Sequence, residues 1–323
     1  MRGEQLLTPG RRRALRWILT VAIVTVVAAL FTRALIANAD ALGSLDLRPD
    51  AWIAGALVLF ALAVVLSGVL WGRMIAHLGG ITVRVAEAIR VHCLSWLLKY
   101  IPGQVGSVVN KLTWAHSRGV PKSLATLSFF YENAFLIIGS IVPTGLILLF
   151  LGALDLAGGD GGIVLLTAAS VLPLLVLTSR PVLRWGTNQV ARRVLKRQVP
   201  DEHFLTSPSA LKYQLMYLIP RIVNGTGLVL IAISMFEVPA SAYIPLASAY
   251  IFAGAAGILA VFVPSGIGVR ESVFVLLAVA YLPVEQAIVL ALAARLLATL
   301  GDALVAAIYG ALRFTAARAA PTT

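Results

Sequence analysis

An arginine and a glutamate stand side by side in a segment that is otherwise apolar. Arg270 and Glu271 are the only charged residues between positions 238 and 284, and they follow directly on Pro264-Ser265-Gly266-Ile267-Gly268. A guanidinium can bind a phosphate through two parallel hydrogen bonds, and a carboxylate beside it can orient the guanidinium or carry a proton. The pair therefore indicates either a phosphate-binding site or an internal salt bridge that holds the segment together.

Three further charged residues lie deep in apolar stretches. At 1.5 Å per residue, Glu132 is about 15 Å and Arg295 about 18 Å along its predicted span, and Asp302 follows two turns after Arg295. Charges at this depth cost free energy and by default indicate function. We expect Glu132 and Arg295 to form an ion pair and Asp302 to face the same cavity. A structural role and a role in charge pairing or proton coupling both stay open.

Two lysines flank a second interruption of the chain, at Pro102-Gly103-Gln104-Val105-Gly106. Lys99 precedes it and is expected to face a polar pocket. Lys111 follows it, and either faces the same pocket or extends its ammonium group to the cytoplasmic membrane edge. His92 and His116 are interpreted as residues of the membrane interface rather than as proton carriers. A weaker signal comes from Pro220, which precedes two polar residues within a span, Arg221 and Asn224.

The two interruptions are related by a fixed offset of 162 residues. Proline and glycine break or redirect helices. In membrane transporters, helices interrupted at corresponding places in two halves indicate the substrate site. The offset therefore predicts an internal repeat whose two broken helices meet at one site. It pairs Pro102 with Pro264, Gly106 with Gly268, Pro121 with Pro283, Ala125 with Ala287 and Gly139 with Gly301.

Composition indicates a membrane protein. Of the 323 residues, 59% are hydrophobic and only 12% are charged, and the mean hydropathy is +0.92. A soluble domain would contain about twice that share of charged residues, and several apolar runs reach the about 20 residues that a helix needs to cross a bilayer. The single cysteine, Cys93, excludes an internal disulfide and a cysteine metal cluster.

We therefore expect an all-α polytopic membrane protein with one transmembrane domain over residues 1–323. The first apolar stretch follows Arg11-Arg12-Arg13 and is interpreted as a span, the alternative being a cleavable signal peptide. The segments 84–117 and 244–281 are too polar or too broken for simple spans, and are expected to be re-entrant hairpins, although full crossing stays open. Full spans are expected near 16–37, 50–71, 123–151, 162–180, 212–236 and 283–312.

The charges of the short loops set the predicted orientation. Basic residues gather near the N-terminus, in the loop 180–212 and in the C-terminal tail, whereas the loop 152–161 has acidic residues only. Because loops rich in lysine and arginine stay in the cytoplasm, both termini are expected there. Three spans separate the two hairpins, so the second hairpin is inverted relative to the first. The sequence thus predicts two inverted repeats, about 10–151 and 162–315, each with two spans, a broken hairpin and a further span.

The residues around both interruptions resemble a known family. The stretches are L-L-K-Y-I-P-G-Q-V-G-S-V-V at 97–109, A-x-x-S-x-x-x-E-N at 125–133 and V-P-S-G-I-G-V-R-E-S at 263–272. They are similar to the lysylphosphatidylglycerol synthase transmembrane (flippase-like) family over roughly residues 10–315. Ser265 stands where the family usually has glycine. Asn133 stands where it usually has arginine, so any role of that arginine is absent or moved.

The resemblance implies a lipid transporter of the cytoplasmic membrane, for an anionic, aminoacylated or polyprenyl-phosphate-linked lipid. Broken helices expose backbone groups that must line a polar cavity, and helix N-termini at the hairpin tips attract anions. Glu132, Glu271 and Asp302 are then expected to pair charges or carry protons. The predicted lipid-phosphate site comprises Lys99, Gly103, Gln104, Gly106, Lys111, Ser265, Gly266, Gly268, Arg270 and Arg295, with helix breaks at Pro102 and Pro264.

Other functions remain open at this point. One alternative is a secondary transporter for a small solute or ion, and another is a non-transporting subunit of a lipid or cell-envelope synthase or an enzyme acting on lipid. Since no catalytic or nucleotide-binding motif occurs, we expect no enzyme and no cofactor or metal. The chain ends at Thr323 without the aminoacyltransferase domain of the family's synthases, so aminoacyl transfer is not expected. The expected partners are the lipid substrate and the bilayer but no nucleic acid, while a homo-oligomer and a neighbouring lipid-modifying enzyme stay open.

Overall fold

The protein is built from helices that match the predicted spans. The computed structural model describes residues 50–100, 105–157, 172–194, 199–260, 266 and 268–318, and the regular elements among them are all helical. Its four longest helices are α3 (Ala51–Gly79), α6 (Lys122–Ala157), α9 (Ser207–Met235) and α12 (Val284–Arg318). These four, and the stretch Ala240–Leu259, are long and apolar enough to cross a membrane. The prediction of a multi-pass all-α membrane protein is therefore confirmed.

Two predicted spans fall wholly or mostly outside the described residues. The span near 16–37 lies outside them, and of the span near 162–180 only residues 172–180 are described. Beyond it, the basic segment contains α8 (Arg180–Val194) and the short 3₁₀ helix η3 (Asp201–His203). An ion pair of 2.7 Å between Arg184 and Asp201 joins these two elements.

Local signals in the sequence set the ends of α3 and α9. Asp50 accepts a hydrogen bond of 2.8 Å from the backbone N–H of Ile53, and so caps the first turn of α3. Gly80 ends α3 in the left-handed conformation, with φ 59°, which glycine adopts without strain. Thr206 caps α9 in the same way as Asp50, by accepting from the N–H of Ser209.

Both segments that were expected to be broken are pairs of packed helices. The first consists of α4 (Val85–Leu97), the 3₁₀ turn η1 (Leu98–Tyr100) and α5 (Val105–Ser117). The second consists of η4 (Ala240–Ala242), α10 (Tyr243–Leu259) and α11 (Val269–Ala278). Helix α5 begins at Val105, inside the interrupted stretch 102–106, and α11 begins at Val269, directly after the stretch 264–268. Five predicted tip residues lie outside the described part of the chain: Pro102, Gly103, Gln104, Pro264 and Ser265.

The lengths of the helices in the two pairs differ. With 13 residues each, α4 and α5 are about 20 Å long, which is shorter than a hydrocarbon core of about 30 Å. The stretch Ala240–Leu259, which includes α10, is long enough to cross by itself. Each helix of the first pair is therefore too short to cross a bilayer by itself, whereas the first stretch of the second pair is long enough.

Polar side chains hold the first pair together. The amide of Asn110 on α5 donates to the carbonyl of Val91 at 3.0 Å and to the hydroxyl of Ser95 at 2.8 Å, both on α4. At the open end, Glu87 accepts hydrogen bonds from Arg118 and from the indole of Trp114 at 2.9 Å. The polar residues that made 84–117 unsuitable as a lipid-facing span thus largely join its two helices to each other.

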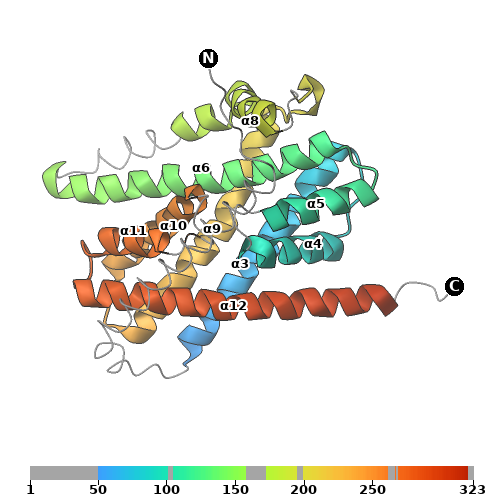
Figure 1. Cartoon of the computed structure of the whole chain (residues 1–323). Coiled ribbons are helices and arrows are strands. Elements are labelled where there is room, and N and C mark those ends of the chain that lie inside the picture. Colours follow the sequence, from blue (N-terminus) through green and yellow to red (C-terminus); the bar gives the residue numbers. More distant parts are fainter. Residues whose placement is uncertain are drawn as a thin grey trace, which may run out of the picture.

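The six main elements form one bundle in which each contact has a counterpart (Figure 1). Helices α3 and α9 pack along each other at the centre, between α6 and α12. The pair α4/α5 contacts α3, α6 and α12, and the pair α10/α11 contacts α9, α12 and α6. Exchanging α3 for α9, the pair α4/α5 for the pair α10/α11, and α6 for α12 leaves this list of contacts unchanged. Each broken pair therefore packs against long helices of both halves.

Two glycines that the offset pairs occupy equivalent helix crossings. A Cβ atom at Gly139 on α6 would lie 2.7 Å from Nε2 of Gln214 and 3.0 Å from Cδ2 of Leu218, both on α9. A Cβ atom at Gly301 on α12 would lie 3.3 Å from Cβ of Phe60 on α3. The offset found in the sequence thus relates the place where α6 meets α9 to the place where α12 meets α3.

Candidate functional site

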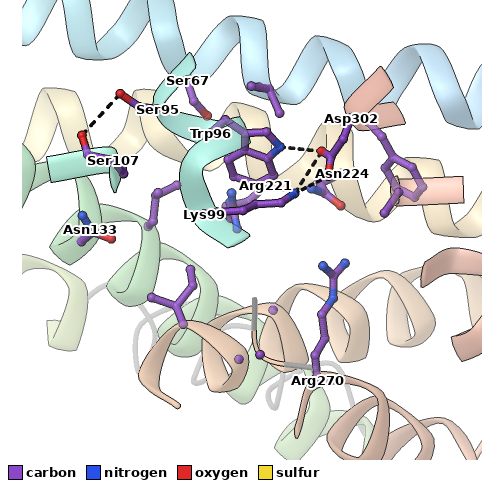
Figure 2. Close-up of a pocket in the computed structure, with 18 of the residues that line it drawn as sticks. Ser67, Ser95, Trp96, Lys99, Ser107, Asn133, Arg221, Asn224, Arg270 and Asp302 are labelled. Carbon is purple, nitrogen blue, oxygen red and sulfur yellow. Dashed lines mark hydrogen bonds and ion pairs between the residues drawn. The ribbon is translucent and has the colours of Figure 1, made fainter. Parts of the chain in front are cut away.

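A cavity of about 190 Å³ lies between the two halves of the bundle. One water molecule needs only about 10–15 Å³ of such volume, so the space admits a larger group. Side chains from α3, α9, both broken pairs and both outer long helices line it (Figure 2). The cavity is therefore the place where the helix breaks and the intramembrane charges of the sequence converge.

One wall of the cavity carries an ion pair between the two halves. The ammonium of Lys99 lies 2.7 Å and 3.0 Å from the two carboxylate oxygens of Asp302 on α12. The indole N–H of Trp96 donates to the same carboxylate at 2.7 Å, and the Lys99 ammonium lies 4.1 Å from the centre of the Trp96 ring (Figure 2). The two residues expected at the cavity from separate helices thus bind each other directly.

A second polar cluster joins α4, α5 and α6. The ammonium of Lys111 donates to Glu132, whose other carboxylate oxygen lies 3.2 Å from Nδ1 of His92. Exposure is 2% for Lys111, 4% for Glu132 and 5% for His92. The expectation of a Glu132–Arg295 pair is therefore wrong. Because α5 packs on α6, the lysine is the nearer cation, and no sequence pattern reports that distance.

The same cluster shows that two simpler interpretations of the sequence are wrong. Lys111 does not extend to the membrane edge, since its ammonium is enclosed between Glu132 and the ring of Trp71, whose centre lies 4.8 Å away. His92 is not an interfacial residue, since it is buried and faces the cavity. His116, by contrast, is exposed near the end of α5.

Glu271 binds the start of its own helix and a residue of the next one. Its carboxylate accepts a hydrogen bond of 2.6 Å from the N–H of Gly268, which has φ 86°, and so caps α11. Its other oxygen lies 3.8 Å from the guanidinium of Arg295 on α12. The second broken pair is thus bound to the following long helix by an ion pair, as the first is, with the signs of the charges exchanged.

Arg270 extends from α11 toward the cavity (Figure 2). Its guanidinium lies 4.3 Å from the centre of the Tyr250 ring, an arrangement that fixes its position without neutralising its charge. Arg221 and Asn224 of α9 line the same space. Nε of Arg221 and Oδ1 of Asn224 are buried and have no hydrogen-bond partner within the described part of the chain.

The described lining is electrostatically positive. It contains five lysines and arginines but two carboxylates, Glu132 and Asp302. Electrostatic interactions are stronger in the protein interior than in water, and a buried charge needs a partner. The excess of cations therefore favours an anionic occupant. The five cations are Lys99, Lys111, Arg221, Arg270 and Arg295.

A comparison with protein families identifies the family of the chain. The family model described as the lysylphosphatidylglycerol synthase TM region matches residues 15–306. The chain belongs to this family. A comparison with curated proteins found no match. The family resemblance of the two interrupted motifs is thus confirmed, and it gives the protein a lipid-related role in the membrane.

In this member of the lysylphosphatidylglycerol synthase TM family, seven of the ten predicted site residues that the structure describes line the main cavity. Gly266 has φ 63° and lies against Gly257 of α10. Gly106 and Gly268 occupy the helix starts but are not in the cavity wall, and Glu271 lines a small adjoining pocket. The predicted residues that line the main cavity are Lys99, Lys111, Glu132, Gly266, Arg270, Arg295 and Asp302.

Several cavity residues of this family member were not found from the sequence. Trp96 precedes Lys99 by three residues, so helical spacing alone could have placed both on one face. Tyr250 sits in an apolar helix and has no such signal. Asn133 lines the cavity and donates to the carbonyl of Phe129 in its own helix at 2.8 Å. The offset pairs Asn133 with Arg295, which supplies a guanidinium to the cavity from the other half.

Proposed function

We propose that this protein is a flippase that moves a lipid between the leaflets of the cytoplasmic membrane and is not an enzyme. Its substrate is an anionic, aminoacylated or polyprenyl-phosphate-linked lipid. The observation that carries the proposal is the cation-rich cavity between two equivalent sets of broken and long helices. The lipid headgroup passes through this cavity, while the acyl or prenyl chains stay in the bilayer.

The proposed mechanism is alternating access by two inverted repeats. Support comes from the counterpart contacts of the two halves, from the paired glycines and from the charges of the short loops. Such repeats rock against each other around a fixed site. The Lys99–Asp302 ion pair joins the first broken pair to α12 of the other half, so it lies where rocking would separate charges. An arriving phosphate would compete with Asp302 for Lys99 and so couple binding to movement.

Arg270→Ala is expected to lower the rate of lipid transport about tenfold or more, because a hydrogen bond to a charged group contributes about 1.5–3 kcal/mol. Glu271→Ala is expected to reduce transport by releasing the first turn of α11 and with it Arg270. Both variants are measured in vesicles with a fluorescent anionic lipid whose outer-leaflet copies are quenched by dithionite.

The matched control is Arg192→Ala, which removes an exposed arginine of α8 outside the cavity. It should transport at the parent rate. If the Arg270 and Glu271 variants also keep the parent rate, the assigned site is wrong. If the parent moves no lipid but takes up a water-soluble anion, the protein is a solute transporter instead.

The orientation of the chain predicts which engineered cysteines react from which side. The parent cysteine, Cys93, is fully buried, so it should give little background labelling. Arg192→Cys lies in the basic segment and should react only when a membrane-impermeant maleimide reaches the cytoplasm. Glu237→Cys is exposed in the loop before η4 and should react from outside in intact cells. Reaction of both from one side would contradict the proposed topology.

A further inference from the structure

The cations of the cavity divide into two groups by their partners. Lys99, Lys111 and Arg295 each have a carboxylate nearby, on Asp302, Glu132 and Glu271 respectively. Arg221 and Arg270 form no ion pair with any described residue, and both line the same cavity. The wall therefore carries two positive charges that the described part of the chain does not balance.

The two arginines stand with two further polar groups whose hydrogen-bonding capacity is not used. Arg221 and Asn224 are three residues apart on α9 and share one face of the helix. Tyr250 is 4% exposed, and its hydroxyl, like Nε of Arg221 and Oδ1 of Asn224, is buried without a partner among the described residues. Buried polar atoms in proteins are almost always hydrogen-bonded. Three such atoms on one cavity wall, beside the Arg270 guanidinium, form a set of hydrogen-bonding groups that a polar ligand in the cavity would satisfy.

We propose that Arg221, Asn224, Tyr250 and Arg270 form a subsite for a phosphate group with two negative charges. A terminal phosphate monoester or a diphosphate has this charge, and in a lipid it would be the headgroup end; this assignment to a lipid rests on the proposed flippase function. The subsite disfavours the cationic headgroup of lysylphosphatidylglycerol. The family name therefore does not describe the headgroup that this chain selects.

The chemistry of the four side chains matches a phosphate. Each guanidinium can give two parallel N–H donors to phosphate oxygens. The tyrosine hydroxyl can donate one more hydrogen bond, and the asparagine side chain can turn its NH₂ group toward the ligand, since both orientations occupy the same space. A phosphodiester with one negative charge would leave one arginine unbalanced. A lysyl group would bring further positive charge into a lining that already has five cations and two carboxylates, which like-charge repulsion opposes.

The test measures how tightly three lipids with identical short acyl chains bind to the purified full-length protein in detergent micelles at pH 8.5. The lipids are dihexanoyl phosphatidic acid, dihexanoyl phosphatidylglycerol and its lysyl derivative, and binding is measured by microscale thermophoresis. Phosphatidic acid is expected to bind about tenfold more tightly than phosphatidylglycerol, which corresponds to 1.4 kcal/mol. The lysyl derivative is expected to bind most weakly. Equal binding of phosphatidic acid and the lysyl lipid overturns the proposal.

Variants connect the preference to the subsite. Arg221→Gln and Arg270→Gln should each remove most of the preference for phosphatidic acid over phosphatidylglycerol, whereas Arg192→Gln, at an exposed position of α8, should keep it. Arg270→Lys preserves the charge and should retain the preference with weaker binding. If the glutamine variants do not fold, as judged by size-exclusion chromatography, Tyr250→Phe gives a second measurement. This variant keeps the ring and should selectively weaken the binding of phosphatidic acid. An unchanged affinity for phosphatidic acid contradicts the subsite.

Two further arms separate the possible outcomes. Inorganic phosphate and pyrophosphate are titrated in place of lipid, and binding as tight as that of phosphatidic acid supports the subsite but assigns it to a soluble ligand. Vesicle transport is measured with the same three headgroups. Charge-ranked binding without lipid movement supports the subsite and contradicts the flippase function. Lipid movement without a charge ranking supports the flippase function and contradicts the subsite.

Discussion

Replacing Lys111 by methionine is expected to destabilise the protein strongly, because it leaves the Glu132 carboxylate without its lysine partner in a buried site. Lys111 and Glu132 are 2% and 4% exposed, and removing one partner of a buried ion pair costs about 3–5 kcal/mol. The measurement is the melting temperature of the detergent-solubilised protein, followed by differential scanning fluorimetry.

Two comparisons make this result specific to the pair. Lys111→Met combined with Glu132→Gln removes both charges and should recover most of the lost melting temperature. Lys122→Met removes an exposed lysine at the start of α6 and should have almost no effect. If the Lys111→Met protein has the same melting temperature as the parent, the buried ion pair is contradicted.

His92 adds a pH dependence to the same experiment. Its Nδ1 atom lies 3.2 Å from Glu132, so a protonated imidazole can take over part of the role of the missing ammonium. Protonation is favoured at low pH, and the deficit of Lys111→Met should therefore be smaller at pH 5.5 than at pH 8. The double change Lys111→Met with His92→Gln should lose this dependence.

Gly266→Ala is expected to abolish most lipid transport by displacing the turn that leads into Arg270. Gly266 has φ 63°, where a residue with a side chain costs about 1–2 kcal/mol, and its added Cβ would lie 2.6 Å from Cα of Gly257. The obstacle is backbone rather than a flexible side chain, so α10 or the turn must move. Transport is measured in the same quenching assay, and stability by the melting temperature.

Two other glycines separate the causes. Gly80 also has a positive φ of 59° but nothing lies within 4 Å of its added Cβ, so Gly80→Ala reports the conformational cost alone. Gly310 on α12 lies in open space in an ordinary helix, and Gly310→Ala should be neutral or slightly stabilising. If Gly266→Ala transports as well as Gly80→Ala, the close approach of the tip to α10 does not matter for function.

The elements of the fold were accessible from the sequence because their signals are local. Apolar runs of span length, Gly80 at the end of α3 and the Pro/Gly motifs at 102–106 and 264–268 each act on neighbouring backbone. The start of α5 at Val105 and of α11 at Val269 followed from the same local logic. Gly139 and Gly301, which the offset pairs, each lie where an added Cβ would press against another long helix, Gly139 against α9 and Gly301 against α3.

The partners of the buried charges could not be predicted in this way. Lys99 and Asp302 are separated by 203 residues, and Glu132 forms its ion pair with Lys111 rather than with Arg295. Such choices depend on which helices pack together and on distances of a few ångströms between side chains. A helix period places a residue on a face but does not say which helix lies against that face.

The sequence by itself determined that the chain is a helical membrane protein and which of its segments are broken into pairs of shorter helices. Those properties follow from composition, helix period and the backbone chemistry of proline and glycine, all of which act within a few residues. Only the tertiary structure decided that three of the five cavity cations form ion pairs with carboxylates while Arg221 and Arg270 form none with the described residues. The reason is that an ion pair depends on the distance between two side chains, and for residues far apart in the chain only the packing of helices sets that distance.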